Sequence, residues 1–185
     1  FRGVVKDWIK RIGVSCSLGP PSMVIRRDAY EKLGGYCLDF LYACDWEFYK
    51  RVASFYDWWY EPGILTHYRQ HSNSMTRSLI IEDKEDGGSP GGGHQSAIEI
   101  SEGYLPADVR DEITKKSRMH HNKWCLDRAM IPVHVGRLDS AFCLVQDALR
   151  IDSSPEGIDQ VFTWLSSDKV APLSAYIAER LMADR

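Results

Sequence analysis

The sequence predicts an α/β fold over residues 1–80, followed by a small helical domain. Over the first 80 residues, short apolar and aromatic runs alternate with helical patterns. From Ala97 onward, apolar residues recur with the 3.6-residue period of a helix. The segment between them is rich in glycine and is expected to be a linker. We therefore divide the chain into residues 1–80, 81–96 and 97–185.

The first predicted strand is the apolar run at residues 23–25. Asp28 is expected to cap the helix that follows it. Gly34-Gly35 should end that helix, because glycine readily takes the left-handed conformation of a helix stop. One strand and one helix are thus expected before residue 36.

A second helix is expected to begin at or beside Asp45. One face of it is apolar, and the charged residues are expected to fall outside that face. The apolar residues are Trp46, Tyr49, Val52 and Ala53, and the charged ones are Glu47, Lys50 and Arg51. Two further strands, at 57–60 and 64–68, are predicted on either side of a Glu-Pro-Gly turn.

The composition is that of an ordinary globular protein, with 44% hydrophobic and 26% charged residues. The net charge of −3 argues against a nucleic-acid-binding protein. No apolar run approaches the roughly 20 residues that cross a bilayer, and the five cysteines show no zinc-binding or disulfide spacing. We expect a cytoplasmic location, free or at the membrane periphery, and the missing initial Met indicates a fragment.

Two places in the N-terminal part carry side chains suited to catalysis or binding. Asp45 by itself is typical of a helix cap, whose hydrogen bonds are expected to lower the pKa of the carboxylate. Residues 66–76 combine histidine, arginine and hydroxyl groups at the end of a predicted strand. Arg69 is suited to a bidentate hold on phosphate oxygens, and His71 to a metal ion or a phosphate. His120 and His121 lack neighbours at ligand spacing and are interpreted as surface residues.

Four segments, in this order, resemble the C-terminal, acceptor-side half of a family 2 glycosyltransferase domain of the GT-A type. They are residues 20–27, the Leu-Gly-Gly-Tyr at 33–36, the acidic helix start at 45–51, and residues 66–76. The resemblance covers roughly residues 15–80. It implies transfer of a sugar from a nucleotide-diphosphate donor to an acceptor hydroxyl, usually with inversion, in glycan or polysaccharide biosynthesis. The acceptor would be a glycan, a lipid-linked glycan or a protein.

The same resemblance implies roles for individual residues. Asp45 would be the general base, with Asp39 and Glu47 as less favoured substitutes. A divalent metal, Mn²⁺ or Mg²⁺, would bind the diphosphate, with His71 as a candidate ligand. The expected contacts to the diphosphate are Arg69, His71, Ser72, Ser74 and Thr76.

The chain departs from the family pattern in two ways. It contains no Asp-x-Asp, and Cys44 stands where relatives usually carry Glu. Without the donor-binding half, these residues alone are expected to be inactive. Two alternatives stay open: a degenerate transferase, or a non-enzymatic module in which residues 97–185 dock a partner protein.

Overall fold

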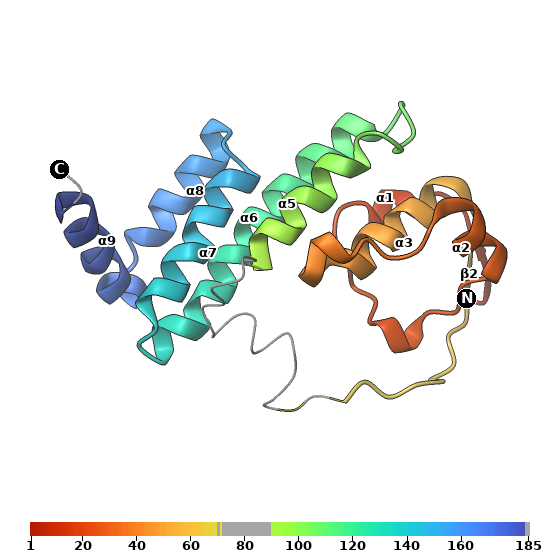
Figure 1. The fold of residues 1–185 in the computed structure, drawn as a ribbon, viewed down its shortest axis with the longest axis horizontal. Coiled ribbons are helices and arrows are strands. Elements are labelled where there is room, and N and C mark those ends of the chain that lie inside the picture. The colour runs from red at the N-terminus through yellow and green to blue at the C-terminus, as the bar shows by residue number, and fades with distance from the viewer. Residues whose placement is uncertain (70, 72–89, 184–185) are drawn as a thin grey trace.

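The computed structural model describes residues 1–69, 71 and 90–183. Its N-terminal unit contains two strands and three helices, and its C-terminal part is entirely helical (Figure 1). The N-terminal elements are β1 (Gly3–Val5), α1 (Ile9–Ile12), α2 (Arg27–Leu33), α3 (Cys44–Phe55) and β2 (Trp58–Tyr60), with 3-10 turns η1 (Pro20–Ser22) and η2 (Leu38–Ala43). The later elements are α5 (Pro90–Ser101), α6 (Arg110–His134), α7 (Leu138–Ile151), α8 (Pro155–Leu165), η3 (Asp168–Val170) and α9 (Ala171–Ala183).

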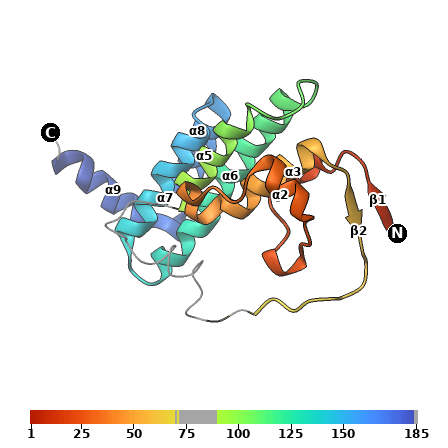
Figure 2. The same ribbon diagram turned by 45° about the vertical axis from the view of Figure 1, so that its right-hand side comes forward.

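The predicted α/β fold is wrong. The described residues are mostly helical, and their only sheet is the antiparallel pair β1–β2, in which Val4 lies opposite Trp59. Figure 2 shows this ribbon at the opposite end of the molecule from α9. The runs at 23–25 and 64–68 form no strand, and Val24 and Ile64 are 98% and 88% exposed. An apolar run becomes a strand only where a partner backbone completes its hydrogen bonds, and none of the described segments does so here.

The predicted stop of α2 at Gly34 and the predicted start of α3 are confirmed to within a residue, but the expected cap is wrong, because α2 begins before Asp28 and Arg26 is its cap residue. Helix α2 begins at Arg27 and keeps Asp28 in its first turn, where a carboxylate favours the helix dipole. It ends at Gly34, whose φ of +81° lies in the region that only glycine adopts freely. Helix α3 begins at Cys44, one residue before the expected start.

The predicted one-sided burial of α3 is wrong. Glu47 and Lys50 are as buried as the apolar residues of this helix, at 1% and 0% exposure. The reason is that α3 packs against α1, η2 and α5 together, so nearly its whole circumference faces other segments.

One hydrophobic core joins the N-terminal unit to the helices that follow. It runs from Ile12 and Trp46 to Leu126 and Leu144. Gly13 allows the close approach of α1 to α6, since a Cβ there would lie 2.8 Å from the Ile113 side chain. The helical region therefore packs on the N-terminal unit.

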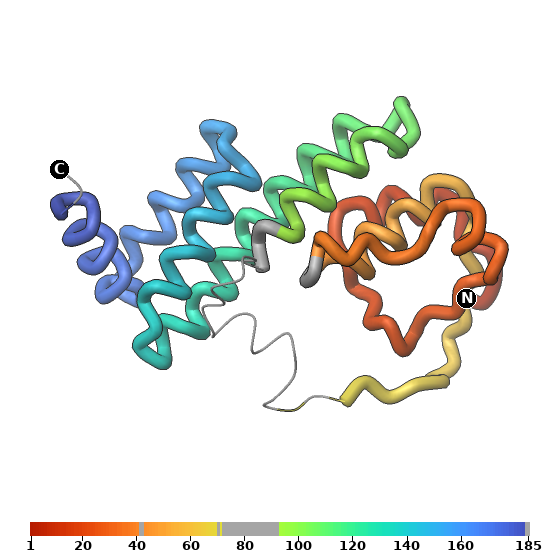
Figure 3. Tube along the Cα trace, viewed as in Figure 1, coloured from red at the N-terminus to blue at the C-terminus, as the bar shows by residue number. Residues whose placement is uncertain are grey.

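The structure describes only residues 90–96 of the predicted linker, and it makes them helical. Helix α5 begins at Pro90, while residues 81–89 lie outside the described residues. From α5 to α8, successive helices run back and forth beside one another (Figure 3). None of the helices formed by the described residues combines the length and the apolar character needed to span a membrane.

Candidate functional site

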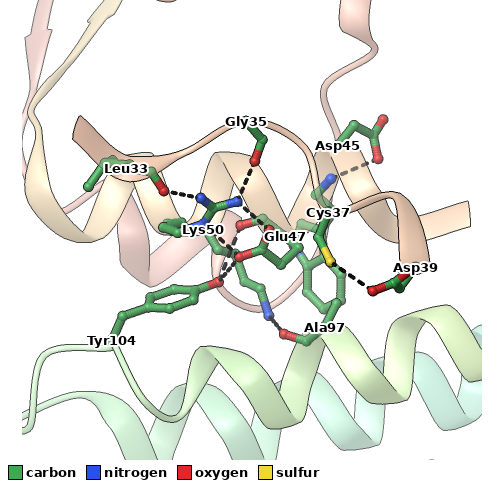
Figure 4. A network of polar contacts seen from close by, with 11 residues as sticks. Leu33, Gly35, Cys37, Asp39, Asp45, Glu47, Lys50, Ala97 and Tyr104 are labelled. Carbon is green, nitrogen blue, oxygen red and sulfur yellow. Dashed lines mark hydrogen bonds and ion pairs between the residues drawn. The ribbon is translucent and has the colours of Figure 1, made fainter. Parts of the chain in front are cut away.

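Asp45 lies in the first turn of α3, where the chain leaves the 3-10 turn η2. Its side chain is half-buried, and its Oδ1 accepts a hydrogen bond from the backbone N–H of Trp46 at 2.7 Å (Figure 4). The indole of Trp46 donates in turn to the carbonyl of Ile12 at 2.6 Å. The carboxylate is thus held at a fixed place by the residue beside it, which is anchored in the core.

Burial raises the pKa of Asp45 above its ordinary value of 3.8. The hydrogen bonds from the backbone N–H groups of Trp46 and of Asp45 itself lower the pKa, but by less. We expected the helix-start hydrogen bonds to dominate and to lower the pKa, so that expectation is wrong. A carboxylate with a raised pKa is a stronger base than an exposed one.

The charge of Asp45 affects the pKa of the Cys44 thiol and that of the Tyr49 phenol. Burial is the largest cause of the raised pKa of each group, and the negative charge of Asp45 raises both further. Each of them therefore stays protonated at neutral pH beside the ionised carboxylate. Asp45 therefore follows an uncharged residue, Cys44, in the sequence.

Glu47, one of the two substitute bases, is fully engaged in holding the structure together. Arg51 donates from Nε and Nη2 to its two carboxylate oxygens at 2.9 and 2.8 Å, and the Tyr104 hydroxyl donates to it at 3.1 Å. Arg51 also donates to the carbonyls of Leu33 and Gly35, at the end of α2 (Figure 4). Glu47 was expected at the surface; it is instead the buried centre of a network joining α2, α3 and the α5–α6 connection.

Asp39, the other substitute, lies in η2 on the surface. Its carboxylate is 4.0 Å from the Cys37 thiol, at the long end of sulfur hydrogen bonds (Figure 4). Among these acids, only Asp45 combines partial burial with the absence of an ion pair to a described residue.

The structure does not bring the predicted diphosphate residues to Asp45. Arg69 and His71 are exposed and lie outside helices and strands, and Figures 1 and 2 show their segment running apart from α3. Ser72, Ser74 and Thr76 lie outside the described residues. Within the described part of the chain, no three His, Cys, Asp or Glu side chains gather in a group that could hold a metal ion. The side chains described here do not fit the expected metal.

Sequence reasoning missed a buried polar cluster between α3, α5 and α6. His121 was interpreted as a surface residue but is 3% exposed, and it lies against His94 from the predicted linker. A signal was present, since Ile113, Ser117, His121 and Cys125 recur every four residues along one face of α6 and are all buried. Because His121 lies on that face, this spacing predicts that it is a core residue.

Comparison with known proteins gives no relative for this chain. No protein-family model, no curated protein and no solved structure matches it.

Proposed function

We propose that this chain carries the general base of a glycosyltransferase, and that Asp45 is that base. Its carboxylate would take the proton from the acceptor hydroxyl as the hydroxyl oxygen attacks the anomeric carbon of the sugar. The nucleoside diphosphate would leave from the opposite face of the sugar, which gives inversion at that carbon.

The observation that carries the proposal is the state of the Asp45 carboxylate. It is fixed at a helix start, half-buried, and has a pKa raised by burial. General bases act best when positioned in this way and when their pKa moves from its ordinary value toward neutral pH. The resemblance of residues 20–27, 33–36, 45–51 and 66–76 to family 2 transferases supports the same role. The proposal rests on these local segments and not on the architecture of the whole chain.

The wider parts of the proposal concern partners and location. The donor would be a nucleotide-diphosphate sugar, and the acceptor a glycan, a lipid-linked glycan or a protein in glycan or polysaccharide biosynthesis. Arg69 and His71 would hold the diphosphate with the hydroxyls of Ser72, Ser74 and Thr76. The reaction would take place in the cytoplasm or at a membrane periphery. We assign no step to a metal, because the described side chains form no site for one.

Replacing Asp45 by asparagine tests the proposal. In the full-length gene product, Asp45→Asn should reduce acceptor-dependent release of nucleoside diphosphate by about 100-fold or more, because the amide cannot take a proton. The assay would use a panel of uridine- and guanosine-diphosphate sugars. The melting temperature should stay within a few degrees of the unmodified protein.

Asp39→Asn is the matched control, since it makes the same change on an exposed carboxylate a few residues away. It should leave the rate within about threefold. If the Asp45→Asn protein is well folded and its rate is similar to that of the unmodified protein, Asp45 is not the general base.

One observation favours the second candidate function, a non-enzymatic docking module. Helices α8 and α9 expose large apolar side chains, with Phe162 at 63%, Leu181 at 60% and Met182 at 76%. In that case Asp45→Asn would change nothing, whereas Phe162→Glu would weaken binding of a partner protein.

A further inference from the structure

Two histidines, two tryptophans and a lysine meet where α3 packs against α5 and α6. The ring of His121 lies 4.3 Å from that of Trp46 and 4.5 Å from that of His94, between centroids. The His94 ring is in turn 4.6 Å from that of Trp124. Both histidines are buried, at 7% exposure for His94 and 3% for His121. The contact between the N-terminal unit and the helical part thus contains two buried imidazoles packed at a tilt against each other.

Hydrogen bonding indicates where His121 would take a proton. Its Nδ1 lies 2.9 Å from the carbonyl oxygen of Ser117, an arrangement that suits an N–H donor at Nδ1. A proton taken up by His121 would then add to Nε2. The ring would gain a full positive charge while it stays packed against the Trp46 indole.

The amine of Lys50 already lies over this indole, and because burial lowers the pKa of Lys50 to about 7, this amine is a cation at pH 5.5. The Nζ of Lys50 lies 3.9 Å from the centre of the Trp46 ring and donates to the carbonyl of Ala97 at 2.7 Å. One aromatic ring stabilises one cation well, but a second buried cation beside it meets repulsion and loses its hydration. Charging His121 therefore opposes the packing of α3 against its neighbours.

The charged and titratable groups around the cluster also oppose a positive charge on His121. His121 faces His94 from α5, Lys50 from α3 and His120 from α6, and none of the described groups that shift its pKa is a carboxylate. Burial, followed by these positive partners, lowers the pKa of His121 well below its usual value. Glu47 and Glu102 favour the charge on Lys50 instead.

We propose that the contact of α3 with α5 and α6 is a proton-sensitive joint, which loosens when His121 becomes charged. An opened state exposes His121 to water, where it binds a proton near pH 6.5. The closed state resists that proton, so closure weakens as the pH falls below 6.5. Asp45 directly precedes Trp46, so an opened joint would displace the carboxylate; only this consequence rests on the proposed function.

Hydrogen exchange at pH 7 and pH 5.5, corrected for the intrinsic effect of pH, tests the joint in this chain. In the unmodified chain, protection of α3 and α5 amides should fall at least fivefold between the two pH values, while α7 and α8 keep theirs. His121→Phe keeps an aromatic ring but cannot take a proton, so most of that loss should disappear. His134→Phe makes the same change at an exposed place on the same helix and should behave like the unmodified chain.

The proposal is contradicted if His121→Phe loses as much protection as the unmodified chain, or if the loss is spread evenly over all helices. If His121→Phe does not fold, the imidazole of His121 in the unmodified chain can be followed by NMR. A ring that stays neutral well below pH 6.5 while the chain is folded supports the joint. A ring that titrates near pH 6.5 with α3 still protected contradicts it. These measurements need no sugar transfer, so their failure is separate from a failure of the proposed function.

Discussion

Arg51→Met is expected to lower the free energy of unfolding by about 3–5 kcal/mol, the usual consequence of leaving one charge of a buried pair without its partner. The side chain of Glu47 is 2% exposed and that of Arg51 17%. Without Arg51, the hydroxyl of Tyr104 is the one hydrogen-bond partner that the described residues leave to the carboxylate of Glu47. The carbonyls of Leu33 and Gly35 also lose their donor. Urea unfolding followed by circular dichroism at pH 7 measures this difference.

Arg26→Met is the matched control for this effect. Arg26 also forms a two-bonded pair, with Asp28, but its side chain is 83% exposed. Exposed pairs contribute little, so the loss should stay below about 1 kcal/mol. Adding Glu47→Leu to Arg51→Met should recover part of the stability, because the buried charge is then gone. A loss below 1 kcal/mol for Arg51→Met would show that the network does not hold the fold together.

Lys50 is expected to make the chain more stable as the pH rises above neutral. Burial lowers the pKa of Lys50 from its ordinary 10.5 to about 7. Between these two values the unfolded chain binds a proton that the folded chain does not, so raising the pH favours folding. The free energy of unfolding should increase by about 2 kcal/mol between pH 7 and pH 9.

Lys50→Met should remove that increase and raise stability at pH 7 by about 1–3 kcal/mol, since an apolar side chain of similar length needs no desolvation of charge. Urea unfolding at pH 7, 8 and 9 provides the comparison. Lys116→Met changes an exposed lysine on α6 and should leave the pH dependence as it is. An unmodified chain whose stability does not change with pH would mean that Lys50 remains charged in the fold.

Local patterns in the sequence were sufficient for the end of α2 and the beginning of α3. The glycine stop at Gly34 and the start of α3 beside Asp45 depend on a few adjacent residues, and both were predicted to within one residue. Strands depend on partners far along the chain. The run at 58–60 found one in β1, whereas the equally apolar run at 64–68 found none among the described residues.

The burial of charged residues on α3 could not be predicted from the sequence, because it too depends on contacts with residues far along the chain. Glu47 meets Tyr104, and Lys50 meets Ala97, across long separations that no helical period encodes. The position of Asp45 at a helix start was predicted correctly, but the direction of its pKa shift was not. That direction depends on how far the folded chain removes the carboxylate from water.

The most direct test of the central claim is the pKa of Asp45 itself, read from the carboxyl ¹³C chemical shift as the pH is lowered through the acidic range. The account predicts a midpoint above the ordinary 3.8, since burial outweighs the hydrogen bonds at the helix start. A midpoint for Asp45 at or below 3.8 would show a carboxylate that only stabilises a helix start, and would contradict its assignment as a base.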